Sequence, residues 1–111
     1  TLILGAGPIG IAIYNQIKNN GLVKVYDTNN NLSQIKESDF LKTLPKYDCI
    51  IGCTGKTTIS KNLHKLISAG TSLISVSSSD REFDSLYLRK LVARNNNCHA
   101  NLFINELLLV N

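Results

Sequence analysis

LILGAGPIG, residues 2–10, is an apolar run followed at once by glycines in the pattern Gly-x-Gly-x-x-Gly. The apolar run is typical of a buried strand, and Pro8 suits the first turn of a helix, where its missing N–H costs nothing. A second apolar run, residues 22–26, ends at Asp27. Strand, glycine turn, helix, strand and acid in this order indicate a dinucleotide-binding βαβ unit.

The composition predicts one globular domain over residues 1–111. Of these residues 43% are hydrophobic, and the formal net charge is +4. No apolar run reaches the roughly 18 residues of a membrane span, and no charged-then-apolar leader opens the chain. Scattered Lys and Arg without interleaved aromatic residues argue against a nucleic-acid partner. Because the first predicted strand starts directly at Thr1, we expect a segment of a longer protein.

Cysteine usage points to a reducing compartment. The chain has three cysteines, Cys49, Cys53 and Cys98. This number is small and odd, which argues against a disulfide framework. Cys49 and Cys53 lie about 13 Å apart along a predicted strand, so they can neither form a bridge nor share a metal. We therefore expect free thiols, no metal site and a cytoplasmic location.

The remaining segments predict an α/β fold. The first helix is expected to turn one apolar stripe toward the sheet, formed by Ile9, Ala12, Ile13 and Ile17. Residues 28–46 have no clear period and could hold a short helix or an edge strand. Residues 47–53 and 71–76 are typical of buried parallel strands.

Three further elements complete the predicted fold. A helix capped by Thr57 or Thr58 should run to Gly70, and Asp84 should cap a helix over 86–93. The tail, residues 101–111, predicts a hairpin around Asn105-Glu106. The expected architecture is a Rossmann-like three-layer α/β fold with a mostly parallel sheet and a C-terminal β-hairpin.

The candidate site lies at the carboxyl ends of the strands, where open α/β sheets bind ligands. Gly5 permits the tight turn, Gly7 lets backbone N–H groups approach a pyrophosphate, and Gly10 lets the helix pack on the strands. Asp27 should bind ribose hydroxyls and repel a 2′-phosphate, which favours NAD over NADP. The expected cofactor-binding residues are Gly5, Gly7, Pro8, Ile9, Gly10, Asp27, Thr28, Cys53, Thr54, Gly55, Ser77 and Ser78.

The pattern assigns no catalytic residue. His64 is expected to be a packed or surface histidine, and His99 a loop residue without a role. The serines at 75 and 77–79 lack a histidine partner for nucleophilic chemistry. Three acids alternate along one loop, Asp80, Glu82 and Asp84. They are expected to cap a helix and to form local hydrogen bonds. Asp80 could instead lie beside the nicotinamide or at a domain interface.

Nearly the whole chain resembles the NAD-binding domain of the S-adenosylhomocysteine hydrolase family. The matching pieces are GAGPIGIAI at 5–13, VYD at 25–27, CTG at 53–55, SSSDREFD at 77–84 and NLFINELLLVN at 101–111. The resemblance implies that NAD stays bound and transiently oxidises the substrate's 3′-hydroxyl. It also implies cofactor contacts by the glycines, by Asp27 and by Thr54-Gly55.

The sequence departs from that family where Ser78 replaces a cofactor-side histidine and Ser75 an asparagine. The substrate-oxidising residues of the family belong to a separate substrate domain. The resemblance therefore implies a dinucleotide-binding segment that needs the rest of a parent chain for catalysis. Two alternatives stay open: an S-adenosylmethionine-dependent methyltransferase, and a non-catalytic NAD-sensing or structural module that supplies a homo-oligomer interface.

Overall fold

A computed structural model describes residues 1–76, 81–94, 102–104 and 107–110 of the chain. The predicted site residues Ser77 and Ser78, together with Asp80, Cys98 and His99, lie outside these ranges. The elements in chain order are β1 (Leu2–Leu4), α1 (Pro8–Ile17), β2 (Lys24–Tyr26), α2 (Glu37–Thr43), the 3-10 helix η1 (Leu44–Lys46), β3 (Cys49–Gly52), the 3-10 helix η2 (Lys61–Leu66), β4 (Ser72–Ser75), α3 (Ser85–Arg94), β5 (Leu102–Ile104) and β6 (Leu107–Val110).

The strands form one sheet in the order β2-β1-β3-β4-β6-β5. The strands β2, β1, β3 and β4 are all parallel, as the βαβ pattern predicts. Strand β6 pairs parallel with β4, and β5 pairs antiparallel with β6. The turn of the predicted C-terminal hairpin, residues 105–106, lies outside the described residues. The α/β class with a mostly parallel sheet is thus confirmed.

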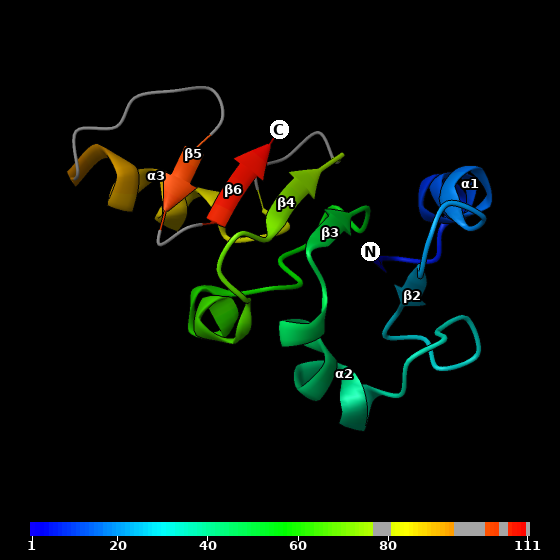
Figure 1. The fold of residues 1–111 in the computed structure, drawn as a ribbon. Helices are drawn as coiled ribbons and strands as arrows, with labels where there is room; N and C mark the ends of the chain where they lie inside the picture. Colours follow the sequence, from blue (N-terminus) through cyan, green and yellow to red (C-terminus); the bar gives the residue numbers. More distant parts are fainter. Residues whose placement is uncertain (77–80, 95–101, 105–106, 111) are drawn as a thin grey trace.

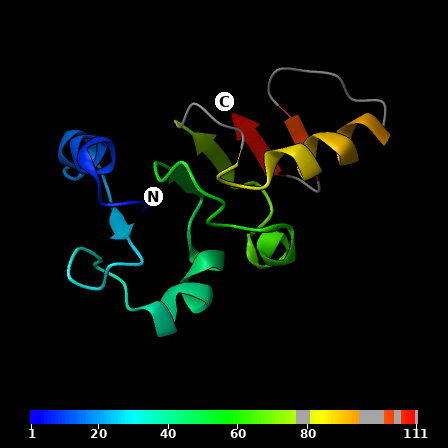
Figure 2. The same ribbon diagram turned by 180° about the vertical axis from the view of Figure 1, so that it is seen from behind.

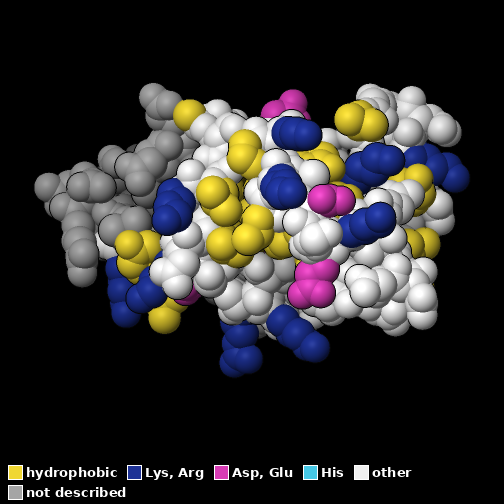
Figure 3. Space-filling view, turned by 90° about the horizontal axis from the view of Figure 1, so that it is seen from below, with side chains coloured by type: hydrophobic (Ala, Val, Ile, Leu, Met, Phe, Trp, Pro, Cys, Tyr) yellow, Lys and Arg dark blue, Asp and Glu magenta, His cyan; other side chains and the backbone are white. Residues whose placement is uncertain are grey.

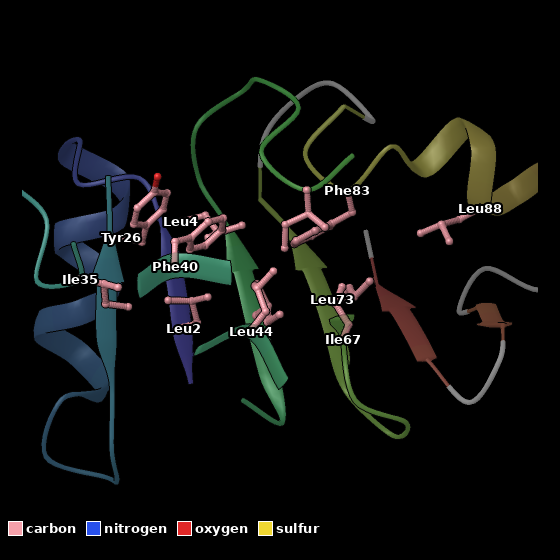
Figure 4. Packing of buried hydrophobic residues seen from close by; sticks show 12 residues of the cluster. Leu2, Leu4, Tyr26, Ile35, Phe40, Leu44, Ile67, Leu73, Phe83 and Leu88 are labelled. Atoms are coloured by element: carbon pink, nitrogen blue, oxygen red, sulfur yellow. The ribbon is translucent and has the colours of Figure 1, made fainter. Parts of the chain in front are cut away.

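Helices lie on both faces of this sheet. Figures 1 and 2 show α1 beside β2 and α3 beside β5, toward opposite ends. Successive strand residues alternate between the faces, so Ile3 packs toward α1 while Leu2 and Leu4 face the larger cluster on the other side. In that cluster, side chains of α2, η1 and α3, and of the residues on either side of η2, pack against the sheet (Figure 4). Strand β1 is therefore completely buried.

The apolar stripe predicted for α1 is wrong in two of its four positions. Ile9 is 57% exposed and Ala12 is also exposed, whereas Ile13 and Ile17 pack on the sheet as expected. The observed inner face is Gly10, Ile13, Tyr14 and Ile17, which has the spacing i, i+3, i+4 and i+7. Apolar residues occur on both sides of this helix, so periodicity alone wrongly placed Ile9 and Ala12 on the buried side.

The long helix predicted after Thr57 or Thr58 is also wrong. The N–H groups of Thr58 and Ile59 donate to the Glu82 carbonyl, which holds this stretch outside a helix. The helical segment begins only at Lys61, as the short η2, and the Asp84 carboxylate accepts from the Lys61 N–H at 3.2 Å. Asp84 directly precedes α3, which is the position predicted for a cap, and its carbonyl accepts from the N–H groups of Tyr87 and Leu88. Its side chain binds the start of η2.

In the ambiguous stretch 28–46, residues 28–36 form turns and irregular structure, and residues 37–46 are helical. Its element α2 buries Phe40, and η1 buries Leu44 against β1 and β3. Helix α2 ends at Thr43, and the chain continues through Pro45 as η1 because a 3-10 helix tolerates proline in its first turn.

Candidate functional site

The carboxyl ends of three parallel strands meet around the glycine turn. The chain runs from β1 to β2 on one side and then to β3 on the other, so the strand order reverses at β1. The Gly5 N–H donates to the Tyr26 carbonyl at 2.8 Å, and the Cys53 N–H donates to the Leu4 carbonyl at 2.8 Å. These bonds hold the turn between the ends of β2 and β3, which is where open α/β sheets bind ligands.

A pocket of about 380 Å³ opens at this edge of the sheet. It brings together six of the predicted cofactor-binding residues, and these are Gly5, Gly7, Asp27, Thr28, Cys53 and Thr54. Four others do not line it, namely Pro8, Ile9, Gly10 and Gly55. The lining residues that the sequence did not single out as cofactor contacts are Tyr26, Phe40, Lys56, Thr57 and Thr58.

The three glycines have different surroundings. A Cβ at Gly5, whose φ is +103°, would lie 2.9 Å from the Thr54 methyl group. A Cβ at Gly10 would lie 1.9 Å from the Gly5 carbonyl oxygen, so Gly10 lets α1 reach the turn. A Cβ at Gly7 would meet no atom of the described residues within 4 Å. Two of the glycines are therefore required by packing, and the third leaves open space beside the pocket.

Asp27 ties the end of β2 to the glycine turn. One carboxylate oxygen accepts from the Ala6 N–H at 2.8 Å, and the other accepts from the Asn29 N–H at 2.8 Å. A carboxylate oxygen can accept more than one hydrogen bond, so both oxygens keep capacity for hydroxyl donors. The side chain is fixed before any ligand arrives.

An aromatic pair forms the floor between β2 and α2. The rings of Tyr26 and Phe40 stack with centroids 3.9 Å apart and planes 8° from parallel. Burial, then the Glu37 carboxylate and then Asp27, raises the pKa of Tyr26 above its ordinary value, so the phenol stays neutral. Sequence reasoning missed this pair because the stretch holding Phe40 shows no periodic signal.

The loop after β3 is held by Glu82, which is completely buried. Its carboxylate accepts from the N–H groups of Thr54 and Gly55. The prediction of local hydrogen bonding is wrong for this acid, because its partners belong to the loop after β3 and not to its own loop. No sequence spacing signals that contact.

His64 is a packed histidine, as predicted. Its Nε2 atom lies 2.7 Å from the Phe83 carbonyl oxygen, and its ring lies 6.0 Å from that of Tyr87. It does not line the pocket. Its other ring nitrogen, Nδ1, is buried and has no hydrogen-bond partner among the residues that the structure describes.

Cys53 should react slowly with alkylating reagents despite lining the pocket. Burial, and then the Glu82 carboxylate, raises the pKa of Cys53 to about 11. At pH 8 the thiolate is then about a thousandth of the total, compared with about a tenth for an ordinary thiol with a pKa near 9. In the variant Cys49→Ser, Cys98→Ser the only cysteine is Cys53. This variant should therefore react with iodoacetamide about a hundredfold more slowly than a thiol of ordinary pKa. The rate should keep rising tenfold per pH unit to pH 10. A plateau below pH 9 would contradict the raised pKa.

The surface shows no strong concentration of charge on the face in Figure 3. Lys and Arg side chains are dispersed there among apolar and uncharged groups. Within the described residues, no helix is long and apolar enough to cross a membrane. The same part of the chain holds no cluster of His, Cys, Asp or Glu side chains suited to a metal ion.

Comparison with known proteins identifies relatives without a described activity. No protein-family model matches the chain. Uncharacterized protein MT0113 of Mycobacterium tuberculosis (strain CDC 1551 / Oshkosh) is 41% identical to it over 102 residues, 91% of this chain. Uncharacterized protein Rv0104 of the same species (strain ATCC 25618 / H37Rv) matches to the same extent. The match covers 20% of each relative, so the chain spans about a fifth of their length.

Proposed function

We propose that this chain is an NAD(H)-binding domain, similar to that of S-adenosylhomocysteine hydrolase, with a Rossmann-like fold and a C-terminal hairpin built from β5 and β6. The observation that carries the proposal is the pocket at the reversal of strand order, where the glycine turn, Asp27 and Thr54 meet. The chain binds the dinucleotide for a redox-assisted reaction whose remaining catalytic residues belong to a longer parent protein.

The pocket residues fit an adenine dinucleotide in their donor set. The N-cap residue of α1 is Gly7, which has no side chain to occupy the N–H groups of the first turn, so these groups and the open side of Gly7 can face a pyrophosphate. The Asp27 carboxylate would accept hydrogen bonds from the ribose hydroxyls. Lys56 also lines the pocket, so its ammonium group would attract an anionic ligand. The bound nicotinamide would supply hydride transfer, and this chain's residues would bind and orient it.

The partner that completes the site is the remainder of the parent chain. A protein five times the length of this segment has room for a substrate domain, and the relatives are of that size. Free thiols at Cys49 and Cys53 agree with the proposed cytoplasmic location, because disulfides are rare there.

Titration calorimetry with NAD, NADP and S-adenosylmethionine tests the proposal. We expect NAD to bind the 111-residue chain and to bind it more tightly than NADP, since a 2′-phosphate would lie near the Asp27 carboxylate. Preferential binding of S-adenosylmethionine would favour the methyltransferase alternative. Heat of dilution alone for all three, up to millimolar ligand, would refute nucleotide binding by this chain.

Asp27→Asn should weaken NAD binding about tenfold or more. The substitution removes a charged acceptor, and hydrogen bonds to charged groups contribute about 1.5–3 kcal/mol each. It also places an amide NH₂ against one of two N–H donors, from Ala6 or Asn29, so the unfolding free energy should fall by about 1–3 kcal/mol. The matched control is Asp48→Asn. Asp48 is exposed and directly precedes β3, so it lies at the amino ends of the strands and the pocket lies at their carboxyl ends. Equal affinities of both variants would argue against the assigned role.

A further inference from the structure

Glu82 is a completely buried carboxylate beside the loop that follows β3. Its side chain is 0% exposed, and its hydrogen bonds in the described part of the chain come from backbone N–H and threonine hydroxyl groups. Burying a charge is costly unless hydrogen bonds compensate for the lost water. The donors of those hydrogen bonds therefore indicate which segment Glu82 stabilises.

Four donors from one loop converge on the Glu82 carboxylate. Oε1 lies 2.5 Å from the backbone nitrogens of both Thr54 and Gly55. Oε2 accepts from the Thr54 hydroxyl at 2.8 Å and from the Thr58 hydroxyl at 3.4 Å. The Glu82 carbonyl also accepts from the N–H groups of Thr58 and Ile59, at 3.0 and 3.1 Å. One residue thus holds both ends of the loop Thr54–Thr58.

The end of β3 is shaped to admit this side chain. A Cβ at Gly52 would lie 2.8 Å from Cγ and 2.9 Å from Cβ and Cδ of Glu82. Any larger residue at position 52 would push the carboxylate away from the loop. Gly52 and Glu82 therefore form one close contact between the end of β3 and the segment that precedes α3.

We propose that Glu82 is a positioning residue that shapes the pocket wall by fixing the Thr54–Thr58 loop. Four of the five loop residues line the pocket, whereas Glu82 does not, so it acts on a ligand only through the loop. Its carboxylate occupies the N–H groups of Thr54 and Gly55. These two amides are therefore unavailable to a phosphate, and the loop presents Lys56 and threonine side chains instead. The ligand-binding part of this inference rests on the proposed nucleotide function.

The unliganded chain provides the first test. Amide hydrogen exchange followed by NMR should show Thr54 and Gly55 protected, although both lie in a loop. In Glu82→Gln these two amides should exchange at least about tenfold faster, because the neutral amide accepts more weakly and turns an NH₂ group toward a donor. Glu37→Gln is the matched control, because that glutamate is exposed on α2. Fast exchange of Gly55 in the wild-type chain would overturn the proposal.

Two further measurements separate this inference from the proposed function. Gly52→Ala keeps the carboxylate but crowds it, so it should accelerate exchange at the same two amides even if Glu82→Gln folds poorly. The dissociation constant for NAD should rise about tenfold in Glu82→Gln and stay unchanged in Glu37→Gln. Altered exchange without any NAD binding by the wild type would refute the nucleotide function and keep the loop-positioning role. Unchanged exchange in both Glu82→Gln and Gly52→Ala would refute the role of Glu82.

Discussion

Gly10→Ala should lower the melting temperature by more than about 10 °C, corresponding to a loss of about 3 kcal/mol or more. The added methyl carbon would lie 1.9 Å from the Gly5 carbonyl oxygen and 3.0 Å from its carbon. Both neighbours belong to the backbone, so neither can rotate away as a side chain would. Either α1 must lift off β1, or the turn must change. Thermal unfolding followed by circular dichroism measures the effect.

Gly7→Ala is the matched control for this prediction. Gly7 has an ordinary φ of −74°, and no atom in the described part of the chain lies within 4 Å of where its Cβ would be. The variant should therefore fold at least as stably as the wild type, and replacing glycine at such a position can add about 0.4–1 kcal/mol. The same methyl group should weaken NAD binding, because it occupies space beside the pocket. Equal melting temperatures for Gly10→Ala and Gly7→Ala would contradict the packing described for the turn.

Phe40→Ala should reduce the free energy of unfolding by about 3–5 kcal/mol, the range for deleting a buried aromatic side chain. The ring is only 6% exposed, stacks on Tyr26 and faces the pocket. Its removal would leave a cavity between α2 and β2. Urea denaturation followed by fluorescence of the tyrosines gives the change in unfolding free energy.

The neighbouring substitution Leu41→Ala controls for effects on α2 itself. Leu41 is 46% exposed and follows Phe40 in the same helix, so its truncation should cost less than about 1 kcal/mol. Phe40→Leu keeps most of the buried volume and should restore most of the stability while leaving the stack broken. A smaller loss for Phe40→Ala than for Leu41→Ala would show that α2 does not pack as described.

The glycine turn and its strands could be predicted because local chemistry alone dictates them. Gly5 needs a positive φ and Gly10 needs close packing, and both demands leave a readable spacing in the sequence. The fold class followed from this turn and from two apolar runs. The inner face of α1 did not, because its exposed side also carries Ile9 and Ile11 while the buried side includes a glycine.

The remaining parts of the site depend on contacts between residues far apart in the chain. Glu82 reaches the loop after β3, and Phe40 reaches Tyr26, without any spacing that announces either contact. The same long-range contacts explain the wrong helix after Thr58, whose N–H bonds to Glu82 instead of starting a helix. Sequence patterns describe neighbours along one element, and these contacts join different elements.

The central place of β1 also determines how the chain can fold. Leu2 pairs with Lys24 on one side and with Ile50 on the other, so β1 is fully paired only after two later strands have been synthesised. None of the ladders among the first four strands is a local hairpin. Such non-local pairing raises the contact order, and high contact order slows folding. During synthesis, the fully apolar segment Leu2–Leu4 stays without its second sheet partner until β3 has left the ribosome.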